Sequence, residues 1–183
     1  MEKLLLHVCC GPCSLGGLHK LKDFKVIFHF QNSNIFPEKE HQKRLIETKK
    51  VAYEYGYDII DEVYDHEEWL NFIKGLEDEP ERGKRCHSCF EHNLEKTAKK
   101  AKELDIHSFT TSLTTSPQKE SKIIFEIAKK IASKYNLNFV DIDFKKQNGF
   151  AISSKLSKKL NLYRQNYCGC EFSFNNNIAS PSE

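Results

Sequence analysis

Residues 3–13, KLLLHVCCGPC, join a short apolar run to three cysteines. The run from Leu4 to Val8 predicts a buried first strand, because it is too short for the apolar core of a signal sequence and no small-residue cleavage site follows it. Gly11 and Pro12 then force a turn, so the neighbouring thiols cannot all point into a core. The stretch therefore predicts a strand that ends in a turn rich in thiols.

Runs of strand type alternate with amphipathic helical stretches along the rest of the chain. Strands are expected at residues 3–9, 24–30, 57–63, 107–113 and 138–143, and helices near 13–22, 38–55, 66–76, 87–104 and 119–135. This alternation is typical of βαβ units, which build parallel sheets. The sequence predicts an α/β fold with a mainly parallel five-stranded sheet and helices on both faces. Gly16 and Gly17, inside the first expected helix, predict a site of close packing.

Length and composition fit one soluble globular domain. The chain has 183 residues, of which 39% are hydrophobic and 30% charged, and no stretch approaches the length of a membrane span. We expect a single catalytic domain over residues 1–174 and a disordered polar tail over residues 175–183. The expected location is the reducing cytoplasm, where clustered cysteines more often bind metals or act in catalysis than form structural disulfides.

All seven cysteines fall into three tight groups. They are Cys9, Cys10 and Cys13, then Cys86 and Cys89, then Cys168 and Cys170. Cysteines that served only as small hydrophobic residues would be scattered through the apolar positions. This grouping indicates thiolates that meet at a metal or in a redox pair. The residues leave open whether the groups bind zinc, hold an iron–sulfur cluster or form an easily reduced disulfide.

Polar side chains follow the ends of the expected strands. The candidates to contact a ligand are Asn32, Asn34, Thr110, Thr111, Ser116 and Lys119. Because the carboxyl ends of parallel strands share one edge of a sheet, we expect these residues to lie near the thiols. The alternative is that they serve as ordinary turn and capping residues.

Positive charge is concentrated near the C-terminus. No acidic residue lies between Asp143 and Glu171, and this interval contains Lys145, Lys146, Lys155, Lys158, Lys159 and Arg164, with Phe150, Tyr163 and Tyr167 among them. A basic segment with interspersed aromatic residues can hold phosphates and stack on bases. The alternative is a lysine-rich helix face without a ligand.

Six motifs in order resemble those of the cobalamin-independent epoxyqueuosine reductase family, QueH. They are HVCCGPCS, FQNSNIFP, RCHSCF, TSLTTSPQK, DFKKQNG and YRQNYCGCEFS, which together carry every cysteine between residues 4 and 174. Two positions depart from the family pattern: Gly11 replaces its usual alanine, and Ser33 replaces its usual proline. Both fall in turns, and neither removes a thiol.

The resemblance implies a fold, a reaction and a substrate. The fold would be of the PP-loop, or nucleotide α-hydrolase-like (HUP-like), class, with CCGPCS where that class has its ATP loop. The reaction would use a [4Fe–4S] cluster, with a second metal ion, iron, suspected nearby. It would remove the epoxide oxygen of epoxyqueuosine at the wobble position of tRNA, consuming two electrons and two protons. A low-potential electron donor would be needed as a partner.

If the resemblance holds, the grouping of the cysteines suggests a role for each of them. Cys9, Cys10, Cys86 and Cys89 are expected to hold the cluster, and Cys13, Cys168 and Cys170 to serve a second metal or a thiol relay. The C-x-C pair could equally share the metals. Lys145, Lys146 and Arg164 are expected at the anticodon-loop backbone.

Three other functions compete with this one. A tRNA thiolase would share the fold, but it should carry a pyrophosphate loop, which CCGPCS replaces. A zinc-stabilised RNA-binding module needs only four thiols and leaves three unexplained. A thioredoxin-like oxidoreductase predicts an isolated C-x-x-C instead of three groups.

Overall fold

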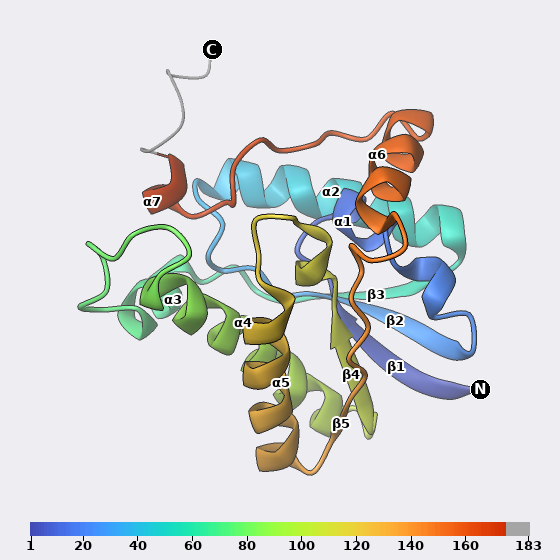
Figure 1. The fold of residues 1–183 in the computed structure, drawn as a ribbon, viewed down its shortest axis with the longest axis horizontal. Helices are drawn as coiled ribbons and strands as arrows, with labels where there is room; N and C mark the ends of the chain where they lie inside the picture. Colours follow the sequence, from blue (N-terminus) through green and yellow to red (C-terminus); the bar gives the residue numbers. More distant parts are fainter. Residues whose placement is uncertain (175–183) are drawn as a thin grey trace.

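Five parallel strands form one sheet in the order β3-β2-β1-β4-β5 (Figure 1). The computed structural model describes residues 1–174, so the tail expected to be disordered lies outside the described residues. The strands are β1 (Glu2–His7), β2 (Phe24–Phe30), β3 (Asp58–Asp61), β4 (Ser108–Thr111) and β5 (Asn138–Phe139). Leu5 of β1 is paired with Ile27 on one side and Phe109 on the other, so β1 lies at the centre of the sheet. The predicted parallel sheet is confirmed.

Helices cover both faces of this sheet (Figure 1). They are α1 (Gly11–Ser14), η1 (Leu18–Lys20), α2 (Glu38–Tyr55), α3 (His66–Phe72), α4 (Lys84–Glu103), η2 (Ser112–Thr115), α5 (Ser121–Tyr135), α6 (Gly149–Lys159) and α7 (Glu171–Phe174). Because side chains alternate along a strand, Leu5 packs with α4 and α5, whereas Leu4 and Leu6 pack with η1, α2 and α6. Each face of β1 therefore has its own hydrophobic core.

The first helix was predicted wrongly over residues 13–22. The chain instead forms α1 and η1, which are separated by a turn that contains Gly16 and Gly17. A Cβ atom on Gly17 would lie 2.3 Å from the ring of Phe144, and one on Gly16 would lie 2.8 Å from the carbonyl oxygen of Gly149. The close packing expected of these glycines is confirmed, and it occurs in a turn instead of a helix.

Four strands, β1, β3, β4 and β5, end earlier than predicted, and side-chain hydrogen bonds lie at the ends of β4 and β5. The hydroxyl of Thr111 accepts a hydrogen bond from the amide of Leu113, which turns the chain from β4 into η2. At the edge strand β5, the Thr110 hydroxyl donates to the Val140 carbonyl and takes the place of a further ladder bond. These side-chain bonds compete with the strand ladder at the edge where ligands gather.

We expect acid to destabilise the fold through two buried histidines, His29 and His41. Burial, followed by the charge of His7 on His29 and of Arg44 on His41, lowers each pKa to about 4. As the pH falls from about 6.5 to about 4, these histidines become protonated in the unfolded chain but stay neutral in the folded chain. The free energy of unfolding therefore decreases over this pH range. His29 alone should cost about 2 kcal/mol of unfolding free energy at pH 5. Urea denaturation of wild type at pH 7.5 and pH 5 measures this loss.

The variant His29→Gln should show a smaller loss of unfolding free energy between these two pH values. His19→Gln, which changes an exposed histidine, serves as the control. Equal losses in wild type and His29→Gln would contradict the assignment.

Candidate metal and active site

The three cysteine groups meet at the carboxyl edge of the sheet. Cys9 directly follows β1, and Cys86 and Cys89 lie in the first turns of α4. Because α4 returns the chain from β3 to the parallel strand β4, its N-terminus lies at that edge. Cys168 and Cys170 come from residues 160–170, the segment between α6 and α7 that we call the strap.

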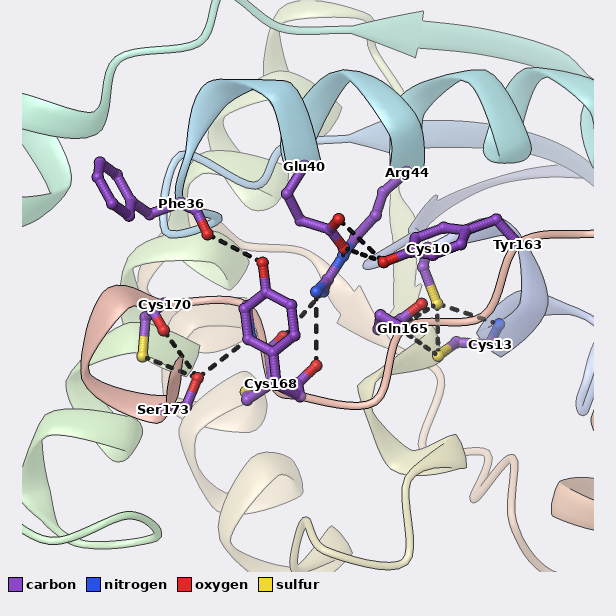
Figure 2. Close-up of polar contacts among 12 residues, drawn as sticks. Cys10, Cys13, Phe36, Glu40, Arg44, Tyr163, Gln165, Cys168, Cys170 and Ser173 are labelled. Atoms are coloured by element: carbon purple, nitrogen blue, oxygen red, sulfur yellow. Dashed lines mark hydrogen bonds and ion pairs between the residues drawn. The ribbon is translucent and has the colours of Figure 1, made fainter. Parts of the chain in front are cut away.

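The first group brings three sulfur atoms together. The Sγ atoms of Cys9, Cys10 and Cys13 all lie within 4.8 Å of one another and could hold a metal ion. Those of Cys10 and Cys13 are 2.6 Å apart, and the Cys13 amide donates to Cys10 Sγ at 3.3 Å, which caps α1 (Figure 2). The Ser112 hydroxyl lies 3.5 Å from Cys9 Sγ. This arrangement matches the chemistry of a thiolate metal site.

The three thiols of this group differ in acidity. Hydrogen bonds from Cys10 and Cys13, and then the charge of Lys119, hold the pKa of Cys9 well below its ordinary value. Burial raises the pKa of Cys10 to about 12, and hydrogen bonding with Cys10 and Cys9 raises the pKa of Cys13. Cys9 is therefore the most acidic thiol of this group.

The second group joins α4 to the strap. Burial, and then the charges of Cys168 and Cys170, raise the pKa of Cys86 and of Cys89. Cys89 and Cys170 pack in the same cluster around Trp69. All seven cysteines are free, so the described residues contain none of the disulfides considered for this site.

Two cavities lie against these thiols. The larger measures 530 Å³ and is lined by a cysteine from each group: Cys13, Cys86 and Cys168. The smaller measures 20 Å³ and also receives one from each group: Cys9, Cys89 and Cys168. Lys119, Phe90 and Cys168 line both cavities, so the two spaces adjoin. Thiols thus line part of the wall of a cavity that can admit a small molecule.

Lys119 supplies positive charge to the thiol-lined walls of both cavities. Burial lowers the pKa of its ammonium group, but the neighbouring thiolates, Cys168 first and then Cys9, raise it more, and the net shift is upward. Lys145 donates from Nζ to the carbonyl oxygens of Lys119 and Ser116 and so fixes the loop before α5. The ammonium group thus stays charged and is held where it faces the thiols.

The predicted ligand-contacting residues either hydrogen-bond to neighbouring strands and loops or line a cavity, and Asn32 does both. Asn32 donates to the Val8 carbonyl, and Thr111 contacts His7, while Thr110 bonds Val140 as described above. Ser116, Lys119 and Arg164 line the larger cavity, and Asn32 and Asn34 line the smaller one. Neither Lys145 nor Lys146 is among the described residues that line either cavity.

Sequence reasoning missed several side chains that contact the thiols, among them Gln165, Asn93 and Ser173. Gln165 Nε2 donates to Cys10 Sγ at 3.1 Å and lies 4.0 Å from Cys13 Sγ (Figure 2). The strap thus brings the side-chain amide of Gln165 to Cys10, and it brings its own two thiols to the cysteines of α4. The only signal for Gln165 is its place within the YRQNYCGC motif.

No helix in the described part of the chain is both long and apolar enough to cross a membrane.

Comparison with solved structures finds a similar fold. A predicted subunit of tRNA methyltransferase from Methanocaldococcus jannaschii superposes with a TM-score of 0.53, covering 83% of this chain and 76% of that one at 10% sequence identity. At this identity the likeness concerns the fold alone, and it agrees with the predicted α/β class with a parallel sheet.

Sequence comparison identifies a family. The profile of epoxyqueuosine reductase QueH matches residues 4–176. The QueH protein of Thermotoga maritima is 38% identical over 176 residues, covering 94% of this chain and 91% of that protein. The QueH protein of Streptococcus pyogenes serotype M1 is 37% identical over 176 residues, covering 92% and 69% respectively. With its thiol groups gathered at one sheet edge and this match over nearly its whole length, the chain belongs to the epoxyqueuosine reductase QueH family.

Proposed function

We propose that this chain is an iron–sulfur-dependent reductase that converts epoxyqueuosine to queuosine in the anticodon loop of tRNA, in the cytoplasm, with residues 1–174 as one catalytic domain. The observation that carries the proposal is the pair of adjoining cavities, each lined by a thiol from all three cysteine groups. Membership of the QueH family supports the same reaction.

The donor set fits an iron–sulfur cluster. Cys9, Cys10, Cys86 and Cys89 are the proposed ligands, and Cys9 and Cys89 already face one small cavity. Cys13, Cys168 and Cys170 remain for a second metal ion, proposed to be iron, or for a thiol relay. When bound, the cluster supplies electrons, received from a low-potential donor, next to the larger cavity.

The protein's own groups suit an epoxide substrate. A cavity of 530 Å³ lies within the usual range for small-molecule sites and can admit the modified nucleoside. The reaction breaks the C–O bonds of the epoxide, takes up two electrons and two protons, and yields a cyclopentene and water. The charged Lys119 is placed in the cavity wall to donate a hydrogen bond or a proton to the departing oxygen.

The rim of the cavity suits the RNA around that nucleoside. The Phe150 side chain is 44% exposed, and the Arg164 guanidinium lies over its ring at 5.7 Å, both within the lining of the larger cavity. The hydroxyls of Ser153 and Ser157 accept from Arg164 Nη1, which holds the guanidinium in place. We propose that this pair stacks on a base next to the target, with the α6 lysines near the phosphates.

Protein purified without oxygen should contain about four iron and four sulfide per chain. It should bleach with dithionite and reduce epoxyqueuosine in tRNA. Cys86→Ser should lose most of its iron. Full iron in that variant would remove Cys86 from the ligand set. A colourless protein with one zinc and no sulfide, even after attempted reconstitution, would overturn the reductase proposal in favour of a zinc-stabilised RNA-binding module.

Lys119→Gln should slow epoxide reduction by about 100-fold or more, because the departing oxygen loses its proton donor. In the metal-free chain the same change should raise the pKa of Cys9, since it removes the neighbouring positive charge. The pH profile of Cys9 alkylation, followed by mass spectrometry, measures that shift. Lys122→Gln, an exposed change on α5, is the matched control. An unmoved Cys9 profile would show that Lys119 does not act on the thiols.

Phe150→Ala should weaken binding of an anticodon stem–loop RNA by about tenfold, the size expected for one lost base stack. Fluorescence anisotropy with labelled RNA measures the affinity. Tyr53→Ala removes a 90% exposed aromatic side chain from α2 and should leave it unchanged. Equal affinity for wild type and Phe150→Ala would place the RNA elsewhere.

A further inference from the structure

A buried arginine lies between helix α2 and the strap. Only 2% of the Arg44 side chain is exposed, although it carries a full charge. Its Nε atom pairs with Glu40 Oε1 at 2.7 Å, one helical turn away. A buried guanidinium needs several acceptors, and the remaining ones come from the strap.

The contacts of Arg44 with the strap are made to its main chain. Nη1 donates to the carbonyl oxygen of Cys168 at 2.9 Å, and Nη2 donates to that of Tyr167 at 3.4 Å (Figure 2). The guanidinium also lies 5.1 Å from the centre of the Tyr167 ring. Arg44 therefore holds the backbone that carries the C-x-C thiols through two carbonyl oxygens and not through the sulfur atoms.

Neighbouring groups hold the strap on both sides of this contact. The hydroxyl of Tyr163 donates to Glu40 at 3.0 Å, which ties the partner carboxylate of Arg44 to the strap as well. The amide of Phe36 donates to the Gly169 carbonyl at 2.8 Å, and the Tyr167 hydroxyl donates to the Phe36 carbonyl at 3.0 Å. Helix α2 and Phe36, two residues before its start, thus contact the strap at several points.

The glycine between the two cysteines is explained by the same contact. Gly169 has a φ of +135°, a region that favours glycine. A Cβ atom at this position would lie 2.9 Å from Arg44 Nη1. The C-G-C spacing thus leaves room for the guanidinium and lets the chain turn so that both thiols approach α4.

We propose that Arg44 is a positioning residue that holds Cys168 and Cys170 against Cys86 and Cys89. Its part in catalysis rests on the proposed function, in which these thiols serve the metal site or a relay. Its part in placing the strap rests on the contacts above. A lysine could not replace it, because one ammonium group cannot reach Glu40 and two carbonyl oxygens with the geometry of the guanidinium fork.

The test is the rate at which each cysteine is alkylated in the full chain, freed of metal by a chelator and kept reduced. In Arg44→Met, the reaction of Cys168 and Cys170 with iodoacetamide should become about tenfold faster, because the strap can open. Cys10 also contacts the strap through Gln165, but it is buried in the turn that caps α1, so its rate should change much less than those of Cys168 and Cys170. Mass spectrometry of the peptides separates the sites, and hydrogen exchange of residues 160–170 should rise with the alkylation.

If Arg44→Met does not fold, Arg44→Lys serves in its place. It keeps the positive charge but lacks the planar guanidinium group that bonds Glu40 and two carbonyl oxygens. This variant should also increase the rates at which Cys168 and Cys170 are alkylated. Lys49→Met removes an exposed charge from the same helix and is the matched control. Unchanged rates at Cys168 and Cys170 in Arg44→Lys would overturn the proposal, as would an equal rise at all cysteines, which would indicate general loosening. Because this readout needs neither cluster nor substrate, it is independent of whether the reductase proposal holds.

Discussion

The structure depends on burying several thiols side by side at the carboxyl edge of one sheet. A buried thiolate is costly unless positive charge or hydrogen-bond donors offset its lost hydration. Here the ammonium group of Lys119 lines both cavities and contributes to the low pKa of Cys9. The reverse also holds, because the thiolates raise the pKa of Lys119 against the effect of burial. The cation and the thiols thus stabilise one another's charged forms.

Sheet topology explains why distant segments can share this charge. β1 is central, so the thiols that follow it lie beside the ends of both β2 and β4. The loop after β4 then carries Lys119 to the same edge, and α4 begins there with Cys86 and Cys89. The strap is different, because no strand delivers it. Its thiols reach the edge through the contacts with α2 that involve Arg44 and Glu40.

The sheet and the meeting of the cysteines were predictable from sequence, because apolar runs such as FKVIFHF mark strands and parallel strands end at one edge. The breaks in the first helix and in β4 were not, since they depend on Phe144 packing on Gly17 and on a hydroxyl of Thr111. The burial of Arg44 could not be predicted for another reason. It lies in EKEHQKRLIETKK, where one charged residue among many gives no sign that it is buried. Only the folded strap distinguishes it from its neighbours.

Delivery by a strap separates the stability of the sheet from the assembly of the thiol site. The two cores on the faces of β1 use side chains from the sheet and from η1, α2, α4, α5 and α6, and the strap contributes only its first residues, Leu160 and Leu162, to one of them. Opening of the strap after Leu162 would therefore break its polar contacts and the packing of Cys170 on Trp69, and would leave these two cores buried. Cys9, Cys10 and Cys13 would also stay in place, because α1 and η2 hold them. A site built in this way can open on one side while the other half of its thiols stays arranged on the rigid sheet.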